Sequence, residues 1–129
     1  MLNHFVTFTF IVAGLVHCLP VLAVVSRARV EAMYGVAVAG PELELLLRHR
    51  ALLFAVVAAL LFAAAARREF RVLAAALGLF SMLGYVVLMR LIGAEGAPLE
   101  RVMRVDLVAS ALLAAGLGAH LYAGSAPEA

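Results

Sequence analysis

The chain has 129 residues, of which 67% are apolar by type and 14% are charged, and its mean hydropathy is +1.11. Soluble domains are about half apolar, so this composition predicts an integral membrane protein, and the length excludes a second domain of ordinary size. A single Cys excludes an intrachain disulfide and a thiolate metal cage. The net charge of +2, scattered along the chain, argues against a nucleic-acid binder.

Four stretches are long and apolar enough to cross a bilayer core, which needs about 20 helical residues. They cover residues 4–25, 43–66, 72–92 and 105–123. Helices of a soluble bundle would carry a polar face at helical spacing, and residues 51–66 have none. The first stretch lacks the positive start of a signal peptide and exceeds its usual apolar length, so we expect it to remain as a helix. The sequence therefore predicts one all-α domain over residues 1–129, an integral membrane four-helix bundle.

The connections between these stretches are short and are marked by helix breakers. Residues 27–34 form a charged segment that predicts a short helix ending at Gly35. Pro41 suits the first turn of the second span, where a missing N–H costs nothing. Residues 67–69 and 93–98 predict turns at opposite ends of the bundle, and the last six residues are expected to fray.

This topology gives the bundle two ends. Side B carries the loops after the first and third spans, and side A carries both termini and the turn at residues 67–69. Side B has seven arginines and side A has three. The side B set is Arg27, Arg29, Arg48, Arg50, Arg90, Arg101 and Arg104. The positive-inside rule then predicts side B in the cytoplasm and both termini outside. If Arg48, Arg50 and Arg104 point into the bundle, the count of arginines falls to four on side B against three on side A.

The starts of the second and fourth spans resemble each other. The matched pairs are Glu44 with Glu100, Arg48 with Arg104, and Arg50 with Asp106. Each half would then be one helical hairpin of a repeated pair, with each Glu four residues before its Arg on the same helix face. The matched charges can also arise without a repeat, because acidic residues favour helix N-termini and arginines near a membrane end extend toward the lipid headgroups. Under the repeat interpretation, Arg50 and Asp106 lie at matching depth and form an ion pair.

Most ionisable residues gather on side B and predict a pocket there for a polar headgroup or a quinone. The residues assigned to this ligand-binding pocket are Glu44, Arg48, His49, Arg50, Arg104 and Asp106. His17 lies about 13 Å inside the first span, where ionisable residues are functional candidates. His17 and His49 are the pair that would ligate a haem or a metal. A hydrogen bond across helices is the favoured role of His17, and no metal site is predicted.

Small residues recur every four positions on three spans, which predicts close helix packing or self-association. The rows are Ala55, Ala59 and Ala63; Ala74 and Gly78; and Ser110, Ala114 and Gly118. No nucleotide-binding or hydrolase motif is present, so neither an enzyme active site nor a bound cofactor is expected. The leading function is a small accessory membrane protein with a polar pocket at one membrane face. The alternatives are a redox-linked component that binds quinone or haem, and a structural scaffold in a larger membrane complex or homo-oligomer.

Several of these residues also carry a resemblance. They are His17, Pro20, Met33-Tyr34-Gly35, the segment LELLLRHRALLF at residues 43–54, Arg101, Arg104 and Asp106. The chain resembles a group of small proteobacterial four-helix membrane proteins that is distantly similar to the DoxX-like superfamily. The resemblance implies a bacterial inner membrane and a link to redox or quinone systems. Members are often labelled phosphopantetheine adenylyltransferase, but this chain has neither the HxGH-type motif nor the alternating strands of those soluble enzymes.

Overall fold

The computed structural model describes residues 1–125, and this part of the chain is built of helices joined by short connections. Four α-helices are long and one is short. In chain order the elements are α1 (Leu2–Val21), η1 (Leu22–Val24), α2 (Arg27–Tyr34), α3 (Gly40–Ala66), η2 (Arg68–Phe70), α4 (Arg71–Ile92) and α5 (Ala97–Ser125). Most of the tail that was predicted to fray, residues 126–129, lies outside the described residues.

The long helices have the length and hydropathy of membrane spans. The four qualifying stretches are Leu2–Val24, Gly40–Ala66, Arg68–Ile92 and Ala97–Gly124. Their outward side chains are apolar: Phe80 is 80% exposed and Leu91 is 78% exposed. Apolar surface on this scale is unfavourable in water and suits contact with lipid. The prediction of an all-α bundle with four spans is therefore confirmed, and by helix length and hydropathy the protein is a multi-pass membrane protein.

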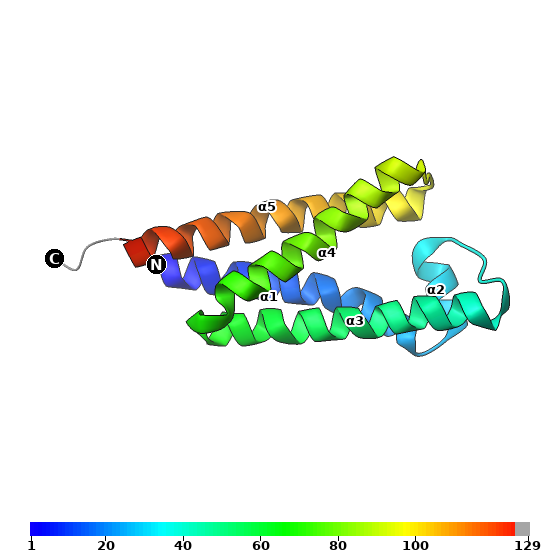
Figure 1. Cartoon of the computed structure of the whole chain (residues 1–129), viewed down its shortest axis with the longest axis horizontal. Helices are drawn as coiled ribbons and strands as arrows, with labels where there is room; N and C mark the ends of the chain where they lie inside the picture. The colour runs from blue at the N-terminus through cyan, green and yellow to red at the C-terminus, as the bar shows by residue number, and fades with distance from the viewer. Residues whose placement is uncertain (126–129) are drawn as a thin grey trace.

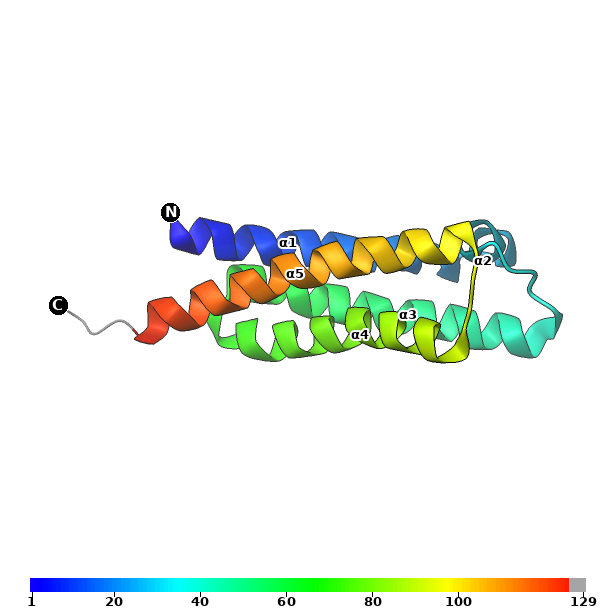
Figure 2. The ribbon, with the colours of Figure 1, turned by 90° about the horizontal axis from the view of Figure 1, so that it is seen from above.

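The four long helices form one elongated bundle (Figure 1 and Figure 2). α1 contacts α3 and α5, and α4 contacts the same two helices, so the order around the bundle is α1, α3, α4, α5. The N-terminus, η2 and the last turns of α5 lie together at the end defined above as side A (Figure 1). α2 and the turn between α4 and α5 lie at the opposite end, side B (Figure 1).

Local sequence signals set most of the helix ends. The short helix predicted over residues 27–34 is confirmed as α2, and it ends where Gly35 takes a left-handed conformation (φ +65°) that suits glycine. Pro41 lies in the first turn of α3. α5 begins at Ala97, eight residues before the apolar stretch at 105, because Pro98 can start a helix and the charged turn that follows is still helical.

The side A half of the bundle is tightly packed through small residues. A Cβ built on Gly116 would overlap the Thr9 side chain, whose Cβ would lie only 2.8 Å away, so α1 and α5 approach closely here. A Cβ on Gly78 would lie 3.1 Å from Leu113 and 3.3 Å from Leu61, both fully buried. Glycine at these positions lets neighbouring helices approach.

Some of the small residues in the rows noted in the sequence are buried between helices, and others lie on the surface of the bundle. Ala74 and Gly78 are buried inside the bundle, and so is Ser110. Ala114 and Gly118 are exposed, because the inward face of α5 is formed by residues such as Leu113 and Gly116 instead. Whether the exposed part of the α5 row contacts a second protein stays a prediction.

Candidate functional site

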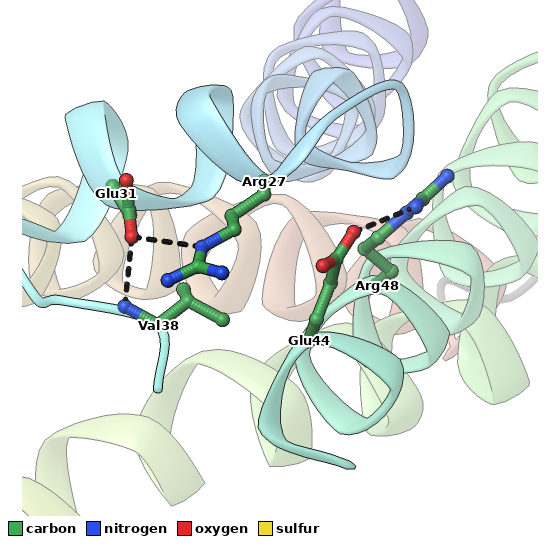
Figure 3. Close-up of polar contacts among 5 residues, drawn as sticks. All are labelled: Arg27, Glu31, Val38, Glu44 and Arg48. Carbon is green, nitrogen blue, oxygen red and sulfur yellow. Dashed lines mark hydrogen bonds and ion pairs between the residues drawn. The ribbon is translucent and has the colours of Figure 1, made fainter. Parts of the chain in front are cut away.

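The side B end is covered by α2, which the connection after it holds in place. Glu31 accepts a hydrogen bond from the Val38 backbone N–H (2.9 Å) and one from Arg27 Nε (3.2 Å) (Figure 3). These two hydrogen bonds lower the pKa of the Glu31 carboxyl below its ordinary value. Val30, Tyr34 and Val38 are buried beneath this cover. The cover therefore has its own small core and a charged clasp on the outside.

Two of the predicted pocket residues are engaged in holding the helices together. Arg48 donates to Glu44 Oε1 (2.9 Å), one turn earlier on α3 (Figure 3). It also donates through Nε to the backbone carbonyl of Val24 (2.8 Å), which lies beyond α1. The last carbonyls of a helix have no partner within the helix. Arg48 provides a hydrogen-bond donor for one such carbonyl here. Arg48 thus connects η1 to α3, Glu44 pairs with its guanidinium, and neither residue lines the cavities described below.

Two others, His49 and Arg104, lie on the surface. His49 is exposed, and Arg104 pairs with Glu100 (3.5 Å) on the exposed face of α5. This pair matches the Glu44–Arg48 pair of α3, as the alignment of the two spans suggested. His17 is buried on α1, so the structure does not place His17 and His49 in a common cavity. Ligation of a haem by this pair stays a prediction without geometric support.

Arg50 points into the bundle and is held by aromatic rings. Its guanidinium carbon lies 5.3 Å from the ring centre of Tyr34, 5.2 Å from that of Phe54 and 5.7 Å from that of Tyr85. Cation–π contacts of this kind can hold a guanidinium away from water. Arg50 and Asp106 line the same small cavity, but within residues 1–125 they form no direct ion pair.

Tyr34, the buried last residue of α2, lines the same cavity as these two charges. Burial raises the pKa of the Tyr34 phenol; the Arg50 guanidinium opposes this rise and the Asp106 carboxylate adds to it. Tyr34 therefore stays a neutral phenol near pH 7, able both to donate and to accept a hydrogen bond. The structure brings together Tyr34, Arg50 and Asp106, of which the sequence singled out the last two.

The small cavity, called the inner cavity below, has a volume of about 20 Å³. It is lined by Val16, His17, Pro20, Tyr34, Arg50, Phe54, Ser81, Met82, Val102 and Asp106. A cavity of this size can hold about one water molecule when polar partners surround it. His17 Nδ1 lies 2.9 Å from the Ala13 carbonyl oxygen, while Nε2 is buried without a hydrogen-bond partner in the described part of the chain.

A larger cavity, called the outer pocket, adjoins the inner cavity and has a volume of about 430 Å³. α1, α2 and α5 form its walls. Its lining residues are Val16, Leu19, Pro20, Leu22, Arg29, Ala32, Met33, Tyr34, Pro98, Arg101, Val102, Val105 and Asp106. Five of them also line the inner cavity, namely Val16, Pro20, Tyr34, Val102 and Asp106. The two cavities therefore share a wall and together extend from side B toward the buried imidazole.

Arg29 and Arg101 are the basic residues of the outer pocket, and neither was predicted from the sequence as a site residue. Unlike Arg27, Arg48 and Arg104, neither has an acidic partner within residues 1–125. A signal was present for one of them: Arg29 and Met33 are four residues apart on the predicted short helix and so share a face. Their pocket exists only because that helix folds back over the ends of α1 and α5, which the spacing alone does not predict.

Comparisons of the chain with protein-family models, with curated proteins and with solved structures find no match. Across residues 1–125, no three His, Cys, Asp or Glu side chains lie close enough together to hold a metal ion. The outer pocket and the inner cavity are therefore the features from which a function can be inferred.

Proposed function

We propose that this protein is a small accessory protein of the membrane that binds an amphipathic molecule with an acidic head group in the outer pocket. One observation carries the proposal: a pocket with mainly apolar walls contains two arginines, Arg29 and Arg101, that form no ion pair within residues 1–125. Small-molecule sites are commonly apolar clefts of about 300–1,000 Å³ with a few placed polar groups, and this pocket fits that description.

The positions of the lining residues fit such a ligand. Arg101 lies in the second turn of α5, near the side B membrane face, and Asp106 lies five residues deeper, about 7 Å along the helix. Leu19 and Leu22 line the pocket and are about half exposed on the outside of the bundle. An apolar tail could therefore enter along α1 from the lipid phase, with its head group at Arg29 and Arg101 and away from the Asp106 carboxylate.

The side chains also support the proposed orientation. Counting exposed arginines only, side B has five (Arg27, Arg29, Arg90, Arg101 and Arg104) and side A has two (Arg67 and Arg68), because Arg71 is buried and Arg48 and Arg50 are partly buried. The positive-inside rule then puts side B in the cytoplasm. The resemblance to DoxX-like proteins and the bacterial inner membrane are part of this proposal.

Binding of a long-chain fatty acid tests the proposal, with its uncharged methyl ester as the matched ligand. The protein is placed in nanodiscs of neutral phosphatidylcholine, and binding of each radiolabelled compound is measured. We expect saturable binding of the acid and a roughly tenfold or greater loss in the double variant Arg29→Ala/Arg101→Ala, since charged hydrogen bonds contribute about 1.5–3 kcal/mol. Arg90→Ala is the control, because Arg90 is exposed on side B and lines neither cavity.

Each result of this experiment has a distinct meaning. Equal binding of acid and ester, or no effect of the double variant, would reject the acidic head group. Competition by phosphatidylglycerol added to the nanodisc would identify a phospholipid as the source of the anion, and its failure to compete would favour a free acid. An absorption spectrum and a mass spectrum of the purified protein address the redox-linked alternative, which requires a co-purifying quinone or the Soret band of a haem.

A further inference from the structure

The hydrogen bond of His17 determines which of its ring nitrogens carries the proton. Nδ1 lies 2.9 Å from the Ala13 carbonyl oxygen, and a carbonyl oxygen can only accept. The proton is therefore on Nδ1. Charging a ring that is 2% exposed inside an apolar bundle is unfavourable. The neutral ring then presents Nε2 as a bare acceptor, and this atom is buried without a partner in residues 1–125.

The surroundings of the inner cavity limit what can satisfy that acceptor. An apolar group leaves Nε2 unbonded, and a carbonyl oxygen or a carboxylate has no proton to give. A cation is disfavoured by the Arg50 guanidinium on the same wall. The site needs a group that donates a proton to Nε2 and that tolerates the donors of Arg50 and Tyr34. A hydroxyl oxygen does both, because its proton is donated to Nε2 while its lone pairs accept from Arg50 or Tyr34.

We propose that the inner cavity is a binding site for one hydroxyl oxygen, with His17 Nε2 accepting its proton in a hydrogen bond and Arg50, Tyr34 and Asp106 around it. The volume of about 20 Å³ accommodates one such oxygen. Two sources share this chemistry. One is a water molecule, and the other is the hydroxyl head of a long-chain alcohol that reaches in from the outer pocket past the shared wall. The site does not depend on the acidic ligand proposed above.

Nitrogen-15 NMR on protein labelled at histidine and held in nanodiscs tests this site directly. The shifts of the two ring nitrogens report which one is protonated and whether the bare one is hydrogen-bonded. The chain has four histidines, so His17→Leu and His49→Gln are used to assign the signals. We expect His17 to be neutral, with its proton on Nδ1 and with a hydrogen-bonded Nε2. A proton on Nε2 would overturn the proposal, and so would an Nε2 that keeps the shift of a free acceptor both without additive and with saturating 1-dodecanol.

Added 1-dodecanol distinguishes the two sources, and dodecane at the same mole fraction is its control. A bound water gives magnetisation exchange between bulk water and the His17 ring and leaves the signals unchanged with either additive. A ligand hydroxyl gives a saturable shift of the His17 signals with dodecanol only. In that case His17→Leu is expected to weaken dodecanol binding about tenfold, the value of one hydrogen bond.

A second variant keeps the test independent of His17 itself. Ser81 lines the inner cavity from α4, and Ser81→Val adds bulk there without touching the histidine. If the oxygen site exists, this variant displaces the oxygen, and the His17 Nε2 shift moves to that of a free acceptor while the exposed His49 shift does not change. Unchanged His17 signals in a folded Ser81→Val protein would also reject the site. Neither result depends on whether fatty acid binds near Arg29 and Arg101.

Discussion

The two ends of the bundle treat a buried polar side chain in opposite ways. On side A, Arg71 is 3% exposed, and its guanidinium donates to the Ala64 carbonyl (3.2 Å), Asn3 Oδ1 (3.0 Å) and Thr7 Oγ1 (3.3 Å). On side B, His17 is equally buried, but Nε2 has no partner in the described residues. A buried polar group that is left unsatisfied costs about 1–3 kcal/mol. The difference is what the proposed hydroxyl site near His17 requires, whereas the Arg71 hydrogen bonds serve stability.

Side A and side B also differ in how tightly their side chains are packed. On side A, Gly116 brings the α5 backbone against Thr9, and no space for a further side-chain atom remains. On side B, α2 covers the ends of the spans, and residues of α2 line the outer pocket and the inner cavity. Natural sequences break local rules of packing and polar satisfaction mainly at functional sites. With side A as the internal reference, the two cavities of side B are the exception to tight packing, as the function proposed there requires.

The packing half of the comparison is tested most strongly at Gly116. In Gly116→Val the new Cβ would overlap Thr9, whose position is fixed by its own hydrogen bond to the Val6 carbonyl (2.8 Å). We expect a loss of about 2–3 kcal/mol in unfolding free energy, measured by denaturant titration in mixed micelles. Gly118→Val is the matched control, because nothing lies within 4 Å of a Cβ there. Equal losses in both variants would mean that only helix propensity is being measured and that side A is not tightly packed.

The polar half of the comparison is tested at Arg71. Arg71→Met keeps the length of the side chain but leaves the Thr7 hydroxyl and the Ala64 carbonyl without their donor. We expect a loss of about 2 kcal/mol in the same titration, since hydrogen bonds to charged groups contribute about 1.5–3 kcal/mol. Arg68→Met serves as the control, because Arg68 is exposed on the same side. If the two variants are equally stable, the Arg71 hydrogen bonds are not what stabilises side A.

The sequence predicted the fold more completely than the site, and the reason is physical. Spans, the short helix over residues 27–34 and the turn at Gly35 depend on apolar runs and on breakers that act within a few residues. A pocket depends on which side chains meet after folding. Arg48 looked like a pocket residue but forms hydrogen bonds to Glu44 and Val24. Arg29 counted only toward the charge of side B, but this exposed arginine also lines the outer pocket, because α2 folds back over the bundle.

The smallest expected effect concerns the clasp that holds α2 over side B. Because the folded-state pKa of Glu31 lies below its ordinary value of 4.5, its contribution to stability is fully present above that pH. The contribution is lost as pH falls through the lowered pKa and the carboxylate gains a proton. The Val38 backbone N–H donates to Glu31, so its amide proton shift should titrate with a midpoint below 4.5.

Glu31→Gln is the matched variant for this titration, since it retains an acceptor oxygen for Val38 but has no charge to lose. We expect the pH dependence of the Val38 shift to disappear in the variant, while the amide of Phe10, buried in the apolar core, shows none in either protein. If the wild-type midpoint is at or above 4.5, the clasp does not stabilise the α2 cover. The cover would then have to be held by the buried Val30, Tyr34 and Val38 side chains alone. Side B would in that case resemble side A in depending on packing, and the two ends would differ only in their cavities.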